Sequence, residues 1–257
     1  MLRVPVVERG SSIPTKLKED AIVEALLEVR FDVPKAAIPE IFLGRLADRQ
    51  PWKGFTQRPL PASQLPAPLR RVDPNLRFQP IIELASTAQN RAVRIGPQVL
   101  SYHQLIPYVG WARLKPELMD VIDGLFQAEP TLNIQRLGLR YMNALRPDAH
   151  TIKAISDLDV KLSVAGEAVL GSVNINFGTN VSRDTQCTVR IATRDLVQGD
   201  LPANTSVFVD VDVYTKDDFS TKDPQIAKAW IESAHTTEKE HFFRLLPKST
   251  IELLKEK

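Results

Sequence analysis

The sequence contains 257 residues, of which 43% are hydrophobic and 25% are charged, and its formal net charge is +2 at pH 7. This composition excludes an intrinsically disordered chain, and the near-balance of charge argues against a dedicated nucleic-acid-binding protein. The single cysteine, Cys187, excludes an internal disulfide and a thiolate metal cluster. No apolar run is as long as a membrane span and no signal-peptide pattern opens the chain, so a soluble, cytoplasmic protein without a membrane partner is expected.

The first half of the chain, residues 1–150, alternates strand and helix patterns. Period-two runs of apolar residues predict strands, and apolar residues at helical spacing predict helices. Gly96 and Pro97 interrupt the third expected strand and indicate a bulge or a bend. The resulting βαββαβ order predicts a ferredoxin-like half. The expected elements are a strand over 25–33, a helix over 37–49, strands over 77–86 and 91–102, a helix over 111–128 and a strand over 132–145.

Residues 56–75 form the one strongly biased segment, with five prolines in a short polar stretch. Such a composition favours extended, polyproline-like backbone over a packed element. The favoured interpretation is a surface loop, and the alternative is a docking motif for a proline-binding partner.

The second half, residues 151–257, is richer in β-branched alternation. Strands are expected over 161–170, 171–177, 186–192 and 207–214, joined by Gly, Asn and Asp turns, which predicts an antiparallel meander. Asp223 followed by Pro224 predicts the start of a long C-terminal helix. The fold class predicted for the whole chain is therefore α+β.

The usual catalytic signatures are missing from the sequence. No glycine-rich phosphate loop, GxSxG nucleophile elbow, HExxH helix or kinase motif is present. The four histidines, His103, His150, His235 and His241, do not have zinc-ligand spacing. A non-enzymatic protein without a cofactor is therefore the favoured expectation.

Asp210 and Asp212 form the first of three weaker candidate sites. Alternation in VFVDVDVY places both carboxylates on one face of a strand, about 7 Å apart, with the intervening valines toward the core. Two hard oxygen ligands could hold Mg²⁺ or Mn²⁺ if His235 came close. The favoured alternative is a solvent-facing strand surface.

The second candidate site lies on the C-terminal helix. His235, Glu238 and His241 follow one another at a spacing of three, which makes each a neighbour of the next on the helix surface. They could extend the acidic strand into a metal or acid–base site. A partly buried structural histidine beside Phe242 and Phe243 is the favoured alternative.

The third candidate site combines aromatic and arginine residues. Arginine with aromatic neighbours is typical of surfaces that stack bases or anchor a protein partner. The favoured alternative is that the aromatic residues line the core while the arginines bind loop carbonyls. The residues of this candidate binding surface are Tyr102, His103, Tyr108, Trp111, Arg136, Arg140, Tyr141 and Asn143.

The segments EALLEVRF, IGPQVLSYHQLIPYVGW, RLGLRYMN, VFVDVDVY and HFFRLL resemble a sporadically distributed family of uncharacterised bacterial proteins of similar length. The resemblance spans nearly the whole chain, which implies that the two halves pack as one body. Sporadic distribution is associated with mobile modules, including toxin–antitoxin and phage-defence components. The family has no assigned activity.

These observations predict a protein-binding component, antitoxin-like or accessory to phage defence, whose partner is encoded by an adjacent gene. Two alternatives stay open. One is an RNA- or DNA-binding or RNA-processing protein that uses Arg136, Arg140 and Tyr141 for stacking and phosphate contacts. The other is a divalent-metal-dependent hydrolase built on Asp210, Asp212 and His235. A homodimer is compatible with each of them.

Overall fold

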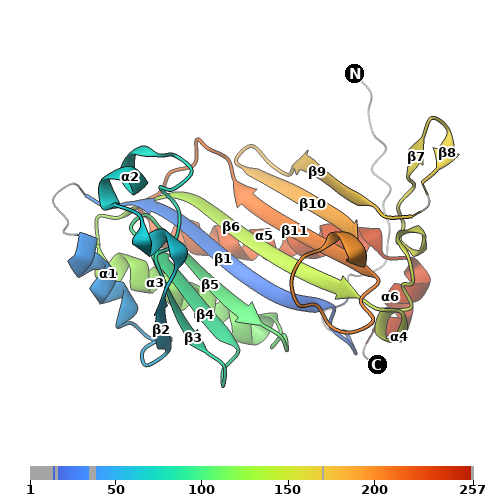
Figure 1. The fold of residues 1–257 in the computed structure, drawn as a ribbon, viewed down its shortest axis with the longest axis horizontal. Helices are drawn as coiled ribbons and strands as arrows, with labels where there is room; N and C mark the ends of the chain where they lie inside the picture. Colours follow the sequence, from blue (N-terminus) through green and yellow to red (C-terminus); the bar gives the residue numbers. More distant parts are fainter. Residues whose placement is uncertain (1–13, 15–16, 35–38, 170, 256–257) are drawn as a thin grey trace.

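A single antiparallel sheet of nine strands runs through the computed structural model, which describes residue 14 and residues 17–34, 39–169 and 171–255 (Figure 1). The strand order is β2-β3-β4-β5-β1-β6-β11-β10-β9. The strands are β1 (Ile22–Asp32), β2 (Thr56–Pro59), β3 (Ile82–Ser86), β4 (Arg91–Gly96), β5 (Val99–Leu105), β6 (Asn133–Leu145), β9 (Asn174–Asn180), β10 (Thr185–Thr193) and β11 (Val207–Thr215), with β7 (Ser163–Val164) and β8 (Glu167–Ala168) in a separate hairpin.

The long helices pack against one face of this sheet. In Figure 1, α3 and α5 lie behind the sheet, and α1 contacts both α3 and β4. Asp223 caps the start of α5, as the sequence predicts, because its side chain accepts a hydrogen bond from the Gln225 amide. The helices are α1 (Pro39–Ala47), α2 (Ala67–Val72), α3 (Trp111–Ala128), α4 (Pro147–His150), α5 (Pro224–Leu245) and α6 (Lys248–Leu254).

The hydrophobic core lies between the sheet and these helices. In β1, Leu27, Val29 and Phe31 are fully buried, whereas the residues between them are only partly covered. Successive side chains of a strand point to opposite faces, so this alternation assigns one face of β1 to the core. Helix α3 adds residues at helical spacing, among them Leu118 and Ile122, which are also buried.

The predicted α+β class, with a large antiparallel sheet and a C-terminal helix, is confirmed. The ferredoxin-like order of the first half is not confirmed. Gly96 and Pro97 belong to a hairpin turn, because Gly96 pairs with Val99 and the expected single strand is divided into β4 and β5. A Cβ atom on Gly96 would lie 2.6 Å from the carbonyl oxygen of Gln79, so the turn has no room for a side chain.

Two other segments differ from expectation. The proline-rich residues 56–75 are extended only in β2, and a 3₁₀ turn and α2 follow, with Pro68 in the first turn of α2, where a missing amide costs no hydrogen bond. The strand expected over 161–170 is instead the small hairpin of β7 and β8, which turns at Ala165 and Gly166, both of which have positive φ.

Strands from both halves of the chain meet in the middle of the sheet. β6 pairs with β1 on one side and with β11 on the other, so that Arg140 lies opposite Leu26 and also opposite Asp212. The strands of residues 1–150 and those of residues 151–257 are therefore hydrogen-bonded into one sheet. Within the described residues, no helix is long and apolar enough to cross a membrane.

Candidate functional site on the open face of the sheet

The face of the sheet turned away from α3 and α5 carries a lattice of charged side chains. We call this face the open face. It consists of the strand residues that alternate with the core residues, and its arginines and carboxylates come from β1, β2, β3, β4, β6, β10 and β11. Its charged residues are Glu24, Glu28, Arg30, Arg58, Glu83, Arg94, Arg136, Arg140, Arg190, Asp210 and Asp212.

Two carboxylates on this face are each shared by two arginines. The buried Glu83 accepts hydrogen bonds from Arg58 (2.6 Å) and Arg94 (2.8 Å). Burial raises the pKa of Glu83, but the two guanidinium groups lower it by more than burial raises it. The pKa therefore lies below its ordinary value. Glu28 accepts from Arg30 (2.8 Å) and Arg136 (2.7 Å) in the same way. In these contacts two carboxylates offset half of the positive charge of four arginines.

Arg140 and Asp210 form a bidentate ion pair across β6 and β11. The distances are 2.8 Å from Nε to Oδ1 and 2.5 Å from Nη2 to Oδ2. The neighbouring Asp212 has a pKa raised to about 6, mainly by burial and further by the charges of Asp210 and Glu28, whereas nearby arginines oppose the shift. A carboxyl group that titrates near neutral pH therefore lies beside a fixed ion pair.

Ser101, His103 and Glu24 form a hydrogen-bonded chain on the same face. The Ser101 hydroxyl lies 2.7 Å from Nε2 of His103, and Nδ1 of His103 lies 2.6 Å from Oε1 of Glu24. These are the groups of a nucleophile, a base and an orienting acid. However, Ser101 is only 8% exposed and His103 only 4%, and neither lines the cleft described below. These two hydrogen bonds therefore hold the Glu24 carboxylate in place.

A cleft of about 950 Å³ opens at one end of the open face. Its floor is formed by β1, β6, β10 and β11, and residues 196–202 form a wall over them. Three apolar residues at the cleft are well exposed: Leu105 (37%), Ile106 (51%) and Leu196 (42%). The lining residues are Val23, Glu24, Leu105, Ile106, Arg140, Met142, Arg190, Leu196, Val197, Gln198, Gly199, Asp200, Leu201, Pro202 and Phe208.

Arg190 is held in this cleft by polar and aromatic contacts. Its Nε donates to Asn174 (3.0 Å), its Nη2 donates to the Leu196 carbonyl (3.4 Å), and its guanidinium lies 5.7 Å from the centre of the Phe208 ring. Within the described part of the chain it forms no ion pair with a carboxylate. Asp200, in the wall formed by residues 196–202, supplies an exposed negative charge. The cleft thus offers both signs of charge next to apolar surface.

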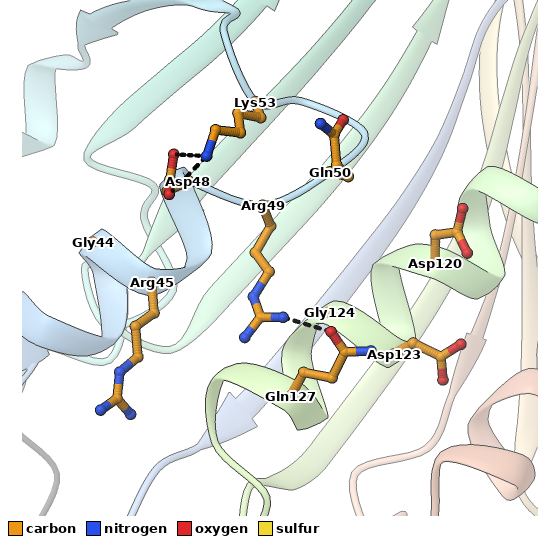
Figure 2. A pocket seen from close by; sticks show the side chains of 10 residues that line it. All are labelled: Gly44, Arg45, Asp48, Arg49, Gln50, Lys53, Asp120, Asp123, Gly124 and Gln127. Atoms are coloured by element: carbon orange, nitrogen blue, oxygen red, sulfur yellow. Dashed lines mark hydrogen bonds and ion pairs between the residues drawn. The ribbon is translucent and has the colours of Figure 1, made fainter.

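A second hollow, of about 900 Å³, lies between α1 and α3 (Figure 2). Figure 2 shows two contacts among its lining side chains: Lys53 contacts Asp48, and Arg49 donates to Gln127. Asp123 binds Lys228 of α5 at 2.6 Å. Among the described residues, no apolar side chain lines this hollow. It therefore lacks the combination of free charge and apolar surface that the open-face cleft has.

The structure divides the sequence-predicted residues between the two faces of the sheet. On the helix side, Tyr102 donates its hydroxyl hydrogen to Glu117, and the amide of Asn143 donates to the Val209 carbonyl. Tyr141 is fully buried there and is not on a surface with Arg136 and Arg140. The open face holds His103, Arg136, Arg140, Asp210 and Asp212, whereas the helix side holds Tyr102, Tyr108, Trp111, Tyr141, Asn143 and His235.

The three residues considered for a metal site are not brought together. Asp210 and Asp212 lie on the open face, whereas His235 is on α5 and contacts Tyr141 beneath the sheet. Within the described ranges, no group of three or more His, Cys, Asp and Glu side chains could hold a metal ion. His241 is also apart from His235, since its Nε2 lies 3.3 Å from the Thr179 hydroxyl.

An aromatic cluster joins several of the predicted residues on the helix side. His235 stacks on Trp111 and lies 3.4 Å from the Tyr141 hydroxyl, and Tyr141 meets Tyr108 edge to face. Burial lowers the pKa of His235 to about 4, with a smaller effect from a nearby lysine, and raises the pKa of the buried Glu238 to about 8. The cluster is packed between α3, α5 and the sheet, which gives it a structural role.

Most residues of the open face were not singled out by sequence reasoning. Glu24 and Glu28 alternate with core residues of β1, which is also the pattern of any strand with one solvated face. Arg190 carries no local signal at all. The sequence shows the alternation within each strand, but it does not show which strands are neighbours in the sheet.

Comparison with known proteins does not place the chain in a family. No family model matches it, and no curated protein matches it.

Proposed function

We propose that this protein is a protein-binding component, and that its open-face cleft takes up a segment of the partner that presents an apolar side chain next to a carboxylate. The observation that supports this proposal is the position of Arg190, which is free of carboxylate partners in the described residues, contacts the exposed Leu196 and lines the same cleft as the exposed Ile106. An arginine next to apolar surface is a common anchor in protein interfaces.

The charges of the open face favour a polypeptide over a nucleic acid. Arg30, Arg58, Arg94, Arg136 and Arg140 are each paired with a carboxylate of the same face. A phosphate backbone would have to displace these carboxylates, or lie beside them, at an electrostatic cost. A protein partner carries both signs of charge and can complement the face without this cost.

The kind of partner expected from the family resemblance, a toxin or a defence protein encoded by an adjacent gene, belongs to the same proposal. The test uses the full chain and the separately purified products of its neighbouring genes. Affinities would be measured by calorimetry for the wild type, Arg190→Glu and Ile106→Asp. Two matched controls lie away from the cleft: Arg183→Glu, whose side chain is 94% exposed, and Ile226→Asp, which is 51% exposed, as Ile106 is.

We expect both cleft variants to bind the partner at least ~10-fold more weakly, and both controls to bind as the wild type does. The proposal is overturned if no neighbouring gene product binds the wild type, or if the partner binds all four variants equally well.

A further inference from the structure

The two edges of the nine-stranded sheet are protected to different degrees. β2 is short, is followed by a turn and ends at Pro59, which cannot donate a ladder hydrogen bond. β9 is seven residues long, is almost entirely exposed and pairs only with β10 among the described strands. Its sequence, NINFGTN, contains no proline and no charged residue. An edge strand without these features is open to pairing with another strand.

The free backbone groups of β9 can be assigned to particular residues. The amide of Val181 bonds to the Thr185 carbonyl and the amide of Thr193 bonds to the Val173 carbonyl, so the odd-numbered residues face β10. Because backbone groups alternate along a strand, the amides and carbonyls of the even-numbered residues point away from β10. The outward-facing residues are Asn174, Asn176, Gly178 and Asn180.

The sequence of β9 is partly symmetric about Phe177. Moving outward from this residue, Asn176 and Gly178 differ, Ile175 and Thr179 are both β-branched, and Asn174 and Asn180 are identical. A two-fold axis at Phe177 pairs even-numbered residues with even-numbered residues. These are the residues whose backbone groups are free.

We infer that two copies of this chain pair through β9, antiparallel and centred on Phe177, and join their sheets edge to edge. The two Phe177 side chains, each 42% exposed in the single chain, would then form the central non-hydrogen-bonded pair, in which side chains approach most closely. Such a contact is isologous, so it closes at two copies and does not propagate.

This pairing has a consequence for the open face. A two-fold axis between antiparallel strands runs perpendicular to the sheet, so the open faces of both copies point to the same side. In each copy Arg190 lies in the cleft and pairs in register with Asn176 of β9. The two clefts therefore lie on either side of the contact between the two β9 strands. The dimer does not depend on what the clefts bind.

The first experiment measures the oligomeric state of the full chain by sedimentation velocity across a dilution series. We expect the wild type to be a dimer at tens of micromolar. Asn176→Pro removes an outward amide while leaving the β10 ladder intact, and Phe177→Lys places two like charges at the axis. We expect both variants to be monomeric with wild-type circular dichroism, and the control Ile226→Lys, on α5, to remain a dimer.

The second experiment tests the register. Phe177→Cys places two thiols directly opposite each other, at a distance that a disulfide can bridge. In the control Thr179→Cys, the two thiols are about 13 Å apart along the strands. Cys187 is fully buried and does not contribute. Oxidation should cross-link the Phe177→Cys variant and not the Thr179→Cys variant. A monomeric wild type, a dimer that survives both edge variants, or cross-linking of Thr179→Cys alone would overturn the inference.

Discussion

The indole ring of Trp111 and the imidazole ring of His235 stack with their centroids 3.8 Å apart and their planes inclined by 12°. Trp111 is the first residue of α3 and His235 lies in the middle of α5, so the contact ties the two long helices together. The pKa of His235 is lowered to about 4, chiefly by burial. The ring is therefore neutral at pH 7, and the stack is an aromatic contact between uncharged rings.

This stack makes the stability of the protein sensitive to acid. The pKa of His235 is about 4 in the folded chain and about 6.5 when exposed, so the contribution to stability is present above pH 6.5 and is lost as the pH falls toward 4. We expect a loss of about 2 kcal/mol between pH 7.5 and pH 5 from this residue. His235→Phe should remove that part of the pH dependence in urea unfolding, whereas His241→Gln should retain it. Equal pH dependence in wild type and His235→Phe would contradict the assignment.

Glu238 should act in the opposite direction. Burial raises its pKa to about 8 from an ordinary value of 4.5, so stability is greatest at low pH and is lost as the pH rises through 8. Glu238→Gln removes the ionisation, and we expect it to stabilise the protein by about 4 kcal/mol at pH 9 relative to its effect at pH 5. Glu232→Gln, on the exposed side of the same helix, is the control and should show no such difference.

Arg140→Ala should be strongly destabilising, because it leaves the Asp210 carboxylate, whose side chain is 6% exposed, without its bidentate partner. Removing one member of a buried pair costs roughly 3 kcal/mol in thermal or urea unfolding. Arg244→Ala removes an exposed pair with Glu240 one turn away on α5 and should cost less than about 0.5 kcal/mol. If the two variants unfold alike, the open-face ion pair does not contribute as proposed.

Gly96→Ala tests the hairpin between β4 and β5. The added methyl group would lie 2.6 Å from the Gln79 carbonyl oxygen and 2.9 Å from Val99, so backbone must move, and we expect a loss of about 2 kcal/mol or more. Gly44→Ala, in α1, meets nothing within 4 Å and should stabilise the protein by about 0.5–1 kcal/mol. Differential scanning calorimetry of the two variants would compare these effects directly.

The sequence predicted the elements with strong local signals. The helix expected over 111–128 is α3 with the same bounds, because its apolar spacing is regular and Gly110 precedes it with a positive φ. Asp223 and Pro224 marked the start of α5 for equally local reasons. Gly96 and Pro97 predict a bulge or a bend where the structure has a hairpin turn, because a bend and a two-residue hairpin turn favour the same residues.

The candidate site could not be assembled in this way. Alternation assigns Arg140 and Asp210 each to one face of its own strand. It does not show that β6 and β11 are neighbours, because these residues are 70 positions apart in the sequence. The same limit applies to His235, which the sequence groups with Asp212 but which lies on the other side of the sheet. Strand order decides which side chains meet, and it depends on pairing between distant segments.

The position of β6 between β1 and β11 also determines when the sheet can be completed during synthesis. Until Val207–Thr215 has left the ribosome, one side of β6 has no strand to pair with, and α5, which covers both strands, follows later still. Contacts between such distant segments slow folding, and an open, apolar strand edge favours aggregation of the nascent chain. The central strands of the finished sheet are therefore held together by the segments that the ribosome releases late.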